Sequence, residues 1–217
     1  MNEVLPGFNG EGSDPEAVII ANRVMEAMGG RQAWDDTRYI SWEFFGRRQL
    51  LWDKYTGDVR IDYVEEDKTI LVNIHSLKGN VNIDGKSITD SDSLAGYLNT
   101  GKSIWINDSY WLVMPFKLKD SGVSLYYLGS DTTALGADAE VLQLTFDQVG
   151  DTPDNVYNVW VDSESKLVTQ WAFFNSSEDA EPSFITPWSG YAKHDDILLS
   201  GGRGKYHLTK IKVLKEV

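Results

Sequence analysis

The sequence predicts a mainly β fold, a strongly curved antiparallel sheet of about ten strands with helices covering its concave face. Apolar and polar residues alternate at period two through most of the chain, as Ile40, Trp42 and Phe44 do on one side of an expected strand. One segment, near residues 91–115, instead repeats its apolar residues at a helical period. A helical insert therefore interrupts a series of strands, and we expect the sheet to curve around it.

The helical insert carries its own start and stop signals. Asp90 can accept hydrogen bonds from the N–H groups of a first turn, and Pro115 lacks the N–H that would continue a last turn. Asn99, Thr100 and Gly101 predict a break, because Asn and Gly enter the left-handed C-cap conformation at low cost. We therefore expect two short helices in this segment.

The second half of the insert, residues 103–116, is apolar nearly all round its circumference. Such a helix must be enclosed by protein on most sides or lie half-sunk in a membrane surface. A membrane span is not expected, because a span needs about 20 uninterrupted apolar residues, and Asn107 and Asp108 stand in the middle of this run.

The N-terminal region predicts a leader and one helix. Residues 1–13 are polar and glycine-rich, without the pattern of a signal peptide, and are expected to form a flexible leader. Asp14 and Pro15 then begin a helix that Gly29 ends. The narrow apolar stripe of this helix consists of Val18, Ala21, Met25 and Met28. Such a stripe predicts a helix that lies across a surface. We expect residues 14–217 to form a single domain.

The alternating segments follow one another at short spacings, which makes each neighbouring pair antiparallel, since parallel pairs need long crossovers. Turn residues such as Gly, Asn and Asp separate them. The expected strands lie within residues 37–44, 48–55, 59–63, 70–75, 81–83, 123–128, 141–146, 156–162, 167–174, 183–193, 197–200 and 206–215.

The composition excludes several classes of partner and chemistry. The chain has 20 basic and 33 acidic residues, and its net charge of −13 repels nucleic-acid phosphates and anionic lipid headgroups. It contains no cysteine, so disulfides, thiolate metal sites and a cysteine nucleophile are all excluded.

Catalytic patterns are sparse. The three histidines, His75, His194 and His207, lie in separate segments and form no helical zinc motif. Adjacent carboxylates such as Glu65 and Glu66 point to opposite faces of a strand. We therefore assign no catalytic residue, metal ligand or cofactor and expect the protein not to be an enzyme, although dispersed Asp and Glu leave a hydrolase as a third alternative.

The glycine-rich segment 201–204 surrounds a cation, Arg203. A phosphate-binding loop would need a helix N-terminus after it, whereas this segment stands between two expected strands. We interpret it as a hairpin turn rather than an anion-binding loop.

The aromatic content is the distinctive feature of the composition, with 8 Trp, 10 Tyr and 8 Phe. Any one tryptophan is most simply explained as core. Together they favour a cavity, because a sheet of this size curled around a helix encloses more volume than side chains readily fill. The residues expected to line that cavity are Trp42, Phe44, Ile61, Tyr63, Trp105, Trp111, Leu142, Leu144 and Phe146.

The order of elements and four segments, WEFFGRRQLLWDKYTGDVRID, YWLVMPFKLKDSGV, TPWSGY and ILLSGGRG, resemble the periplasmic lipoprotein-carrier (LolA-like) superfamily, and in it an uncharacterised branch of envelope proteins. The resemblance covers residues 14–215. It implies an unclosed half-barrel over residues 14–217, with helices as a lid and an apolar cavity that shelters acyl chains. It also implies a location in the periplasm or cell envelope, with a lipid anchor on the full-length precursor.

The leading functional hypothesis is non-enzymatic binding or transport of a hydrophobic or amphipathic ligand, such as an acyl-bearing lipid or lipoprotein. Burial of apolar surface at about 25 cal/mol per Å² stabilises a bound acyl chain by a few kcal/mol after ordering costs. The alternative is a glycan- or protein-binding envelope module that uses exposed aromatic residues. The solvent exposure of the tryptophans discriminates between the two.

Overall fold

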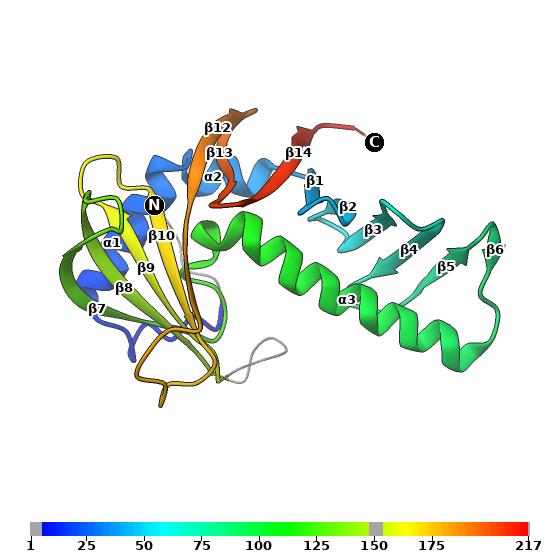
Figure 1. The fold of residues 1–217 in the computed structure, drawn as a ribbon, viewed down its shortest axis with the longest axis horizontal. Helices are drawn as coiled ribbons and strands as arrows, with labels where there is room; N and C mark the ends of the chain where they lie inside the picture. Colours follow the sequence, from blue (N-terminus) through cyan, green and yellow to red (C-terminus); the bar gives the residue numbers. More distant parts are fainter. Residues whose placement is uncertain (1–5, 148–153, 217) are drawn as a thin grey trace.

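The computed structural model describes residues 6–147 and 154–216 (Figure 1). Its helices are α1 (Pro15–Ala27), α2 (Gly30–Asp36), α3 (Ser91–Val113) and the short 3-10 helix η1 (Met114–Lys117). Its strands are β1 (Tyr39–Phe44), β2 (Arg48–Asp53), β3 (Asp58–Tyr63), β4 (Lys68–Asn73), β5 (Gly79–Ile83), β6 (Lys86–Ser87), β7 (Val123–Thr132), β8 (Asp138–Phe146), β9 (Val156–Asp162), β10 (Val168–Phe174), β11 (Phe184–Pro187), β12 (Ser189–His194), β13 (Ile197–Arg203) and β14 (Tyr206–Leu214). The prediction of a mainly β fold is confirmed.

The strands form two antiparallel sheets that one stretch of chain joins. The larger sheet has the order β12-β13-β14-β1-β2-β3-β4-β5-β6, and the smaller one has the order β11-β10-β9-β8-β7. The expected single strand over residues 183–193 is divided at Trp188 into β11 and β12, which are edge strands of different sheets. The two sheets therefore make one curled, unclosed wall, with β6 and β7 at its ends (Figure 1).

The long helix α3 connects the two ends of this wall. Asp90 caps it as expected, since its carboxylate accepts a hydrogen bond from the N–H of Ser93 at 2.9 Å. The helix ends before Pro115, which lies in η1. Figure 1 shows α3 running from β5 and β6 toward the smaller sheet, so the insert lies inside the curve of the wall.

The expected break at residues 99–101 is wrong, because α3 is continuous over its 23 residues. Gly101 is buried and faces β4, where a Cβ atom would lie 2.9 Å from Cγ2 of Ile70 and 3.2 Å from Cγ1 of Val72. The glycine thus allows the helix to approach the sheet closely. The sequence pattern that indicated a C-cap marked a packing contact instead.

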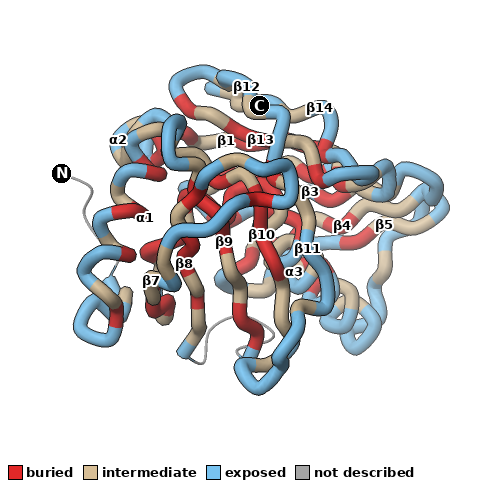
Figure 2. Tube along the Cα trace, turned by 60° about the vertical axis from the view of Figure 1, so that its left-hand side comes forward, coloured by how far each residue is buried: buried red, intermediate tan, exposed pale blue. Residues whose placement is uncertain are grey.

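The two N-terminal helices pack on the inner side of the wall. Three of the four residues of the expected stripe, Ala21, Met25 and Met28, are buried, and Val18 is half-buried. The buried face is wider than expected, because it also includes Ala17, Ile20 and Val24. These residues belong to one core cluster with residues of α3 and of both sheets. Figure 2 shows the buried positions of this wall recurring along β8, β9 and β10.

Part of the expected leader contacts the outer edge of β7. The N–H of Asn9 donates to the carbonyl of Val123 at 3.1 Å, and the N–H of Asp14 donates to that of Leu125 at 2.8 Å. The carboxylate of Asp14 also accepts from the N–H of Tyr127 at 2.9 Å. Residues 1–5 of the leader lie outside the described residues.

Arg203 occupies the junction between the two sheets. Its guanidinium lies 3.3 Å from the ring centroid of Trp188 and donates to the carbonyls of Trp111 at 2.6 Å and Ser200 at 3.1 Å. The side chain is 1% exposed, and burial lowers its pKa to about 9. A hairpin turn is present as expected, but it is displaced to Gly204 and Lys205, because residues 201–203 extend strand β13. The inward direction of Arg203 was not expected.

Lys54 follows β2 and lies under α2. Its Nζ is 3.6 Å from the ring centroid of Trp34 and donates to the carbonyl of the same residue. Burial is the main reason that the pKa of Lys54 falls to about 7, while Asp35 opposes the shift. Trp34 in turn stacks on Phe116, with ring centroids 4.3 Å apart.

The close contact at Gly101 predicts opposite effects for two glycine substitutions in α3. Gly101→Ala should destabilise the protein, because overpacking costs about 1–3 kcal/mol and outweighs the gain of about 1 kcal/mol in helix propensity. Gly96→Ala is the matched control, since nothing lies within 4 Å of its added Cβ, and it should stabilise the protein. Urea unfolding measures both, and equal gains in stability would contradict the close approach.

The depressed pKa of Lys54 predicts a pH-dependent stability. The unfolded chain keeps the ordinary value of 10.5, so above pH 7 it binds a proton that the folded protein lacks. The free energy of unfolding therefore rises by about 1.4 kcal/mol per pH unit from this group, and the gain is lost as the pH falls through about 7. Unfolding of Lys54→Met at pH 7 and pH 9 should lack this rise, whereas exposed Lys78→Met should keep it. An unchanged slope in Lys54→Met would refute the assignment.

Candidate functional site

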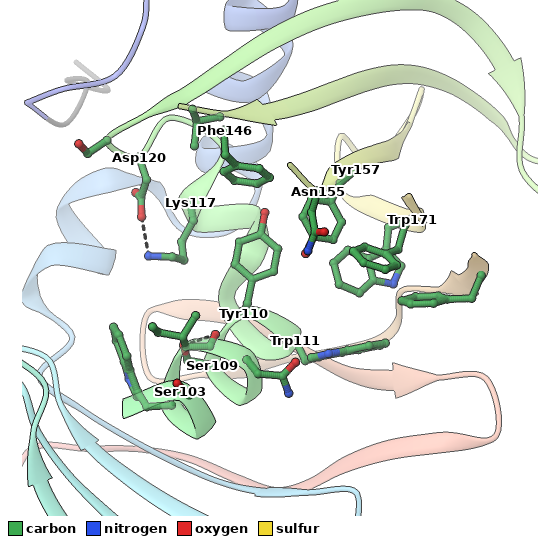
Figure 3. Close-up of a pocket in the computed structure, with 17 residues that line it drawn as sticks. Ser103, Ser109, Tyr110, Trp111, Lys117, Asp120, Phe146, Asn155, Tyr157 and Trp171 are labelled. Atoms are coloured by element: carbon green, nitrogen blue, oxygen red, sulfur yellow. Dashed lines mark hydrogen bonds and ion pairs between the residues drawn. The ribbon is translucent and has the colours of Figure 1, made fainter. Parts of the chain in front are cut away.

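A cavity of about 660 Å³ lies between the second half of α3 and the inner face of the smaller sheet (Figure 3). Ten of the residues that line it are apolar or aromatic: Trp105, Ile106, Tyr110, Trp111, Val123, Phe146, Tyr157, Trp171, Phe173 and Phe184. The remaining lining residues are polar: Ser103, Asn107, Ser109, Lys117, Asp120, Ser121 and Asn155. The cavity is therefore apolar over most of its wall, and most of its polar groups come from α3 and from η1 with the loop after it.

The periodicities of the strands and the helix bring these residues together. Phe146, Tyr157, Trp171 and Phe173 lie on β8, β9 and β10, where residues two apart share the inner face of the sheet. On α3 seven of the nine residues from Ser103 to Trp111 line the cavity, so the helix borders it over most of its circumference. The sheet wall of the cavity is thus one face of its strands, whereas the helix wall is not limited to one face.

The aromatic rings of the wall contact one another. Tyr157 stacks on Trp171 with centroids 5.1 Å apart and an interplanar angle of 8°. Trp111 meets Trp171 edge-on at 4.8 Å and stacks with Phe184 at 5.7 Å. Aromatic pairs at these separations are favourable beyond their buried area, so they hold the wall in a defined shape.

Tyr110 projects from α3 into the space between Phe146 and Tyr157 (Figure 3). Its hydroxyl is buried and has no hydrogen-bond partner among the described residues. Burial raises the pKa of Tyr110 well above its ordinary value, and Tyr157 and Asp120 act in the same direction. The side chain therefore stays a neutral phenol.

The charged residues near the cavity are paired. Lys117 donates to Asp120 at 2.5 Å, and both line the cavity (Figure 3). Two residues before Tyr110, on the opposite side of α3, Asp108 forms a bidentate ion pair with Arg48, at 2.9 and 3.0 Å. Burial raises the pKa of Asp108, although Arg48 opposes this. The second pair ties the helix to β2.

The nine residues expected to line a cavity fall into two groups. Trp105, Trp111 and Phe146 lie at the cavity. The others pack in the core or against it, away from the cavity lining: Trp42, Phe44, Ile61, Tyr63, Leu142 and Leu144. The strands β1 and β3 turn their apolar sides toward other core residues, so the structure brings together only the helix residues and the end of β8.

The sequence analysis missed most of the sheet side of the cavity. Tyr157 on β9 and the pair Trp171 and Phe173 on β10 form its aromatic floor, and Phe184 on β11 lies at its exposed margin. The alternation of Trp171 and Phe173 was visible as a strand pattern. It did not show which sheet the helix leaves partly uncovered.

The described residues contain no cluster of three or more His, Asp or Glu side chains placed to hold a metal ion. None of the helices in the described ranges combines the length and the apolar character that a membrane crossing requires.

No family model and no curated protein matches the sequence. Among solved structures, a DUF1329 family protein from Desulfovibrio piger is similar with a TM-score of 0.51 and 13% identity, over 94% of this chain and 95% of that one. A LolA superfamily protein from Nitrosomonas europaea has a TM-score of 0.39 and 12% identity, over 93% and 94%. MucB in complex with MucA(peri) has a TM-score of 0.27 and 15% identity, over 92% and 62%. At these identities a likeness shows the fold alone, and the first of these structures shares with this chain the curled, mainly β architecture that the sequence predicted.

Proposed function

We propose that the protein binds the acyl part of a hydrophobic or amphipathic ligand in the cavity beside α3 and carries it without chemical change. The observation that supports this most directly is the cavity itself, about 660 Å³ and lined mainly by aromatic and apolar side chains. Ligand sites typically measure about 300–1,000 Å³ and combine an apolar lining with a few polar groups. The polar side, with Lys117 and Asp120, suits the head of an amphipathic molecule.

The energetics of an aromatic cavity suit reversible carriage. Burial contributes about 0.8 kcal/mol for each CH₂ group of an acyl chain. The lost translational and conformational freedom of the ligand offsets about 4–15 kcal/mol of that gain. A chain of ordinary length is therefore held firmly enough to be sheltered from water and weakly enough to be released.

The exposure of the tryptophans favours this proposal over the module with exposed aromatics. Six of the eight are at most 9% exposed: Trp34, Trp42, Trp52, Trp160, Trp171 and Trp188. Trp105 and Trp111 are half-buried and face the cavity. The tryptophans are thus buried or face the cavity, whereas a recognition surface would present them to solvent.

The proposal extends to the unit and its location. We take residues 14–217 as one carrier domain, because α1, α3 and both sheets share one core cluster. A location in the periplasm or cell envelope is proposed from the resemblance to periplasmic carriers, with lipids or envelope proteins as partners.

The proposal predicts that Trp111→Ala weakens binding of a fluorescent fatty acyl probe. The substitution removes a ring that stacks with Phe184 and meets Trp171, so the dissociation constant should rise by about tenfold or more, which corresponds to 1.4 kcal/mol. Because Trp111 is half-buried at the cavity, the loss of stability should stay below the roughly 3–5 kcal/mol typical of a packed tryptophan.

Trp160→Ala is the matched control. Trp160 lies on β9 and packs in a separate cluster with Ala139, Val141 and Ala172, on the outer face of the smaller sheet. This variant should bind the probe with wild-type affinity. Failure of the wild-type protein to bind any acyl probe, together with no co-purified lipid in native mass spectrometry, would reject the proposed function.

A further inference from the structure

We infer that the ligand places an uncharged oxygen acceptor, such as the carbonyl of an acyl ester, against the hydroxyl of Tyr110, and that the cavity thereby recognises neutral acyl esters. This inference rests on the proposed function, because it names the ligand chemistry of the same cavity. It makes Tyr110 a binding residue, a role that the sequence analysis did not assign.

The first observation is an excess of hydrogen-bond donors. The hydroxyl of Tyr110 and the indole N–H groups of Trp105 and Trp171 are buried without a partner among the described residues. All three residues line the cavity. An indole N–H can only donate, so the bound molecule is expected to bring acceptors. A pure hydrocarbon would leave all three groups unpaired.

The second observation is where the Tyr110 hydroxyl lies. Its ring stands among Phe146, Tyr157 and Trp171, with centroids 5.4–6.4 Å away. Figure 3 shows the hydroxyl end of the side chain directed away from α3 into the cavity. A polar donor in such an enclosure must regain a hydrogen-bond acceptor when an apolar ligand displaces water from it, and a polar group of the ligand can supply one.

The third observation concerns charge. Among the described lining residues Lys117 is the one cation, and it is already paired with Asp120 at 2.5 Å. An anionic carboxylate beside Tyr110 would therefore lose its hydration without finding a free cation in this part of the lining. A neutral carbonyl accepts the hydrogen bond and needs no cation.

The chemistry that fits these three observations is an acyl chain with a neutral carbonyl near one end. The chain lies against Trp111, Trp171 and Phe173, and the carbonyl oxygen reaches Tyr110. A free fatty acid at neutral pH has the same chain but would place a charged carboxylate beside the hydroxyl of Tyr110.

The test is displacement of a neutral fluorescent acyl ester from the intact protein by methyl laurate or by laurate at pH 8. In the wild-type protein methyl laurate should be the stronger competitor. Tyr110→Phe removes only the hydroxyl. It should lower the affinity for methyl laurate by about five- to tenfold, the usual effect of one hydrogen bond, and the affinity for laurate by less than about twofold. The affinity for laurate measures how much the acyl chain alone contributes to binding in each variant.

Two controls keep the result specific. Tyr126→Phe alters a tyrosine of β7 that does not line the cavity, and it should change neither competitor. Thermal unfolding of the free protein adds a second measurement: Tyr110→Phe removes a buried donor without a partner and should raise the melting temperature. A lower melting temperature would mean that the hydroxyl has a partner inside the protein, which overturns the inference.

The outcomes separate this inference from the proposed function. The inference is wrong, and acyl binding stands, if the probe binds but Tyr110→Phe lowers the affinities for methyl laurate and laurate equally. The same conclusion follows if the substitution changes neither affinity. If the probe does not bind the wild-type protein at all, the proposed function fails and the inference fails with it.

Discussion

The buried guanidinium of Arg203 is the contact on which the arrangement of the two sheets and α3 depends. It lies on the ring of Trp188, where the chain passes from one sheet to the other, and it donates to the carbonyl of Trp111 near the end of α3. A cation at a helix C-terminus compensates both the unpaired carbonyls and the negative end of the helix dipole. A single side chain therefore connects the bend of the wall with the end of the helix. Its hydrogen bond to the backbone carbonyl of Trp111 also fixes the position of that residue at the cavity.

The cavity follows from the length of α3 relative to the sheets. The first half of the helix packs closely on β4, because Gly101 removes the side chain that would hold it away from Ile70. The second half has moved beyond these strands and faces the smaller sheet, where large rings on both sides meet only partly. The space between them is lined mainly by aromatic residues, because the second half of the helix carries Trp105, Tyr110 and Trp111 and the smaller sheet turns its own rings toward them.

The sequence predicted local structure well and the cavity only in part, for a physical reason. Asp90 and Pro115 act through neighbouring backbone groups, so their roles as cap and stop could be inferred from the sequence alone. Gly101 was misinterpreted because a helix C-cap and a close helix–sheet contact both select glycine, and only the neighbouring strand distinguishes them. Period two identified the apolar side of β1, and the alternation of Trp171 and Phe173 carries the same signal on β10. Which sheet remains uncovered, however, is decided by contacts between distant segments.

The backbone contacts of residues 9–14 along β7 affect how the protein avoids association. An unclosed wall has two strand edges, and exposed edges are templates for pairing with another chain. At β7 the donors and acceptors of Val123, Leu125 and Tyr127 are already engaged by this segment. At the other end β6 is only two residues long and contains Lys86, so it offers little to pair with. Neither end of the wall therefore offers a long free strand edge to a second copy of the chain.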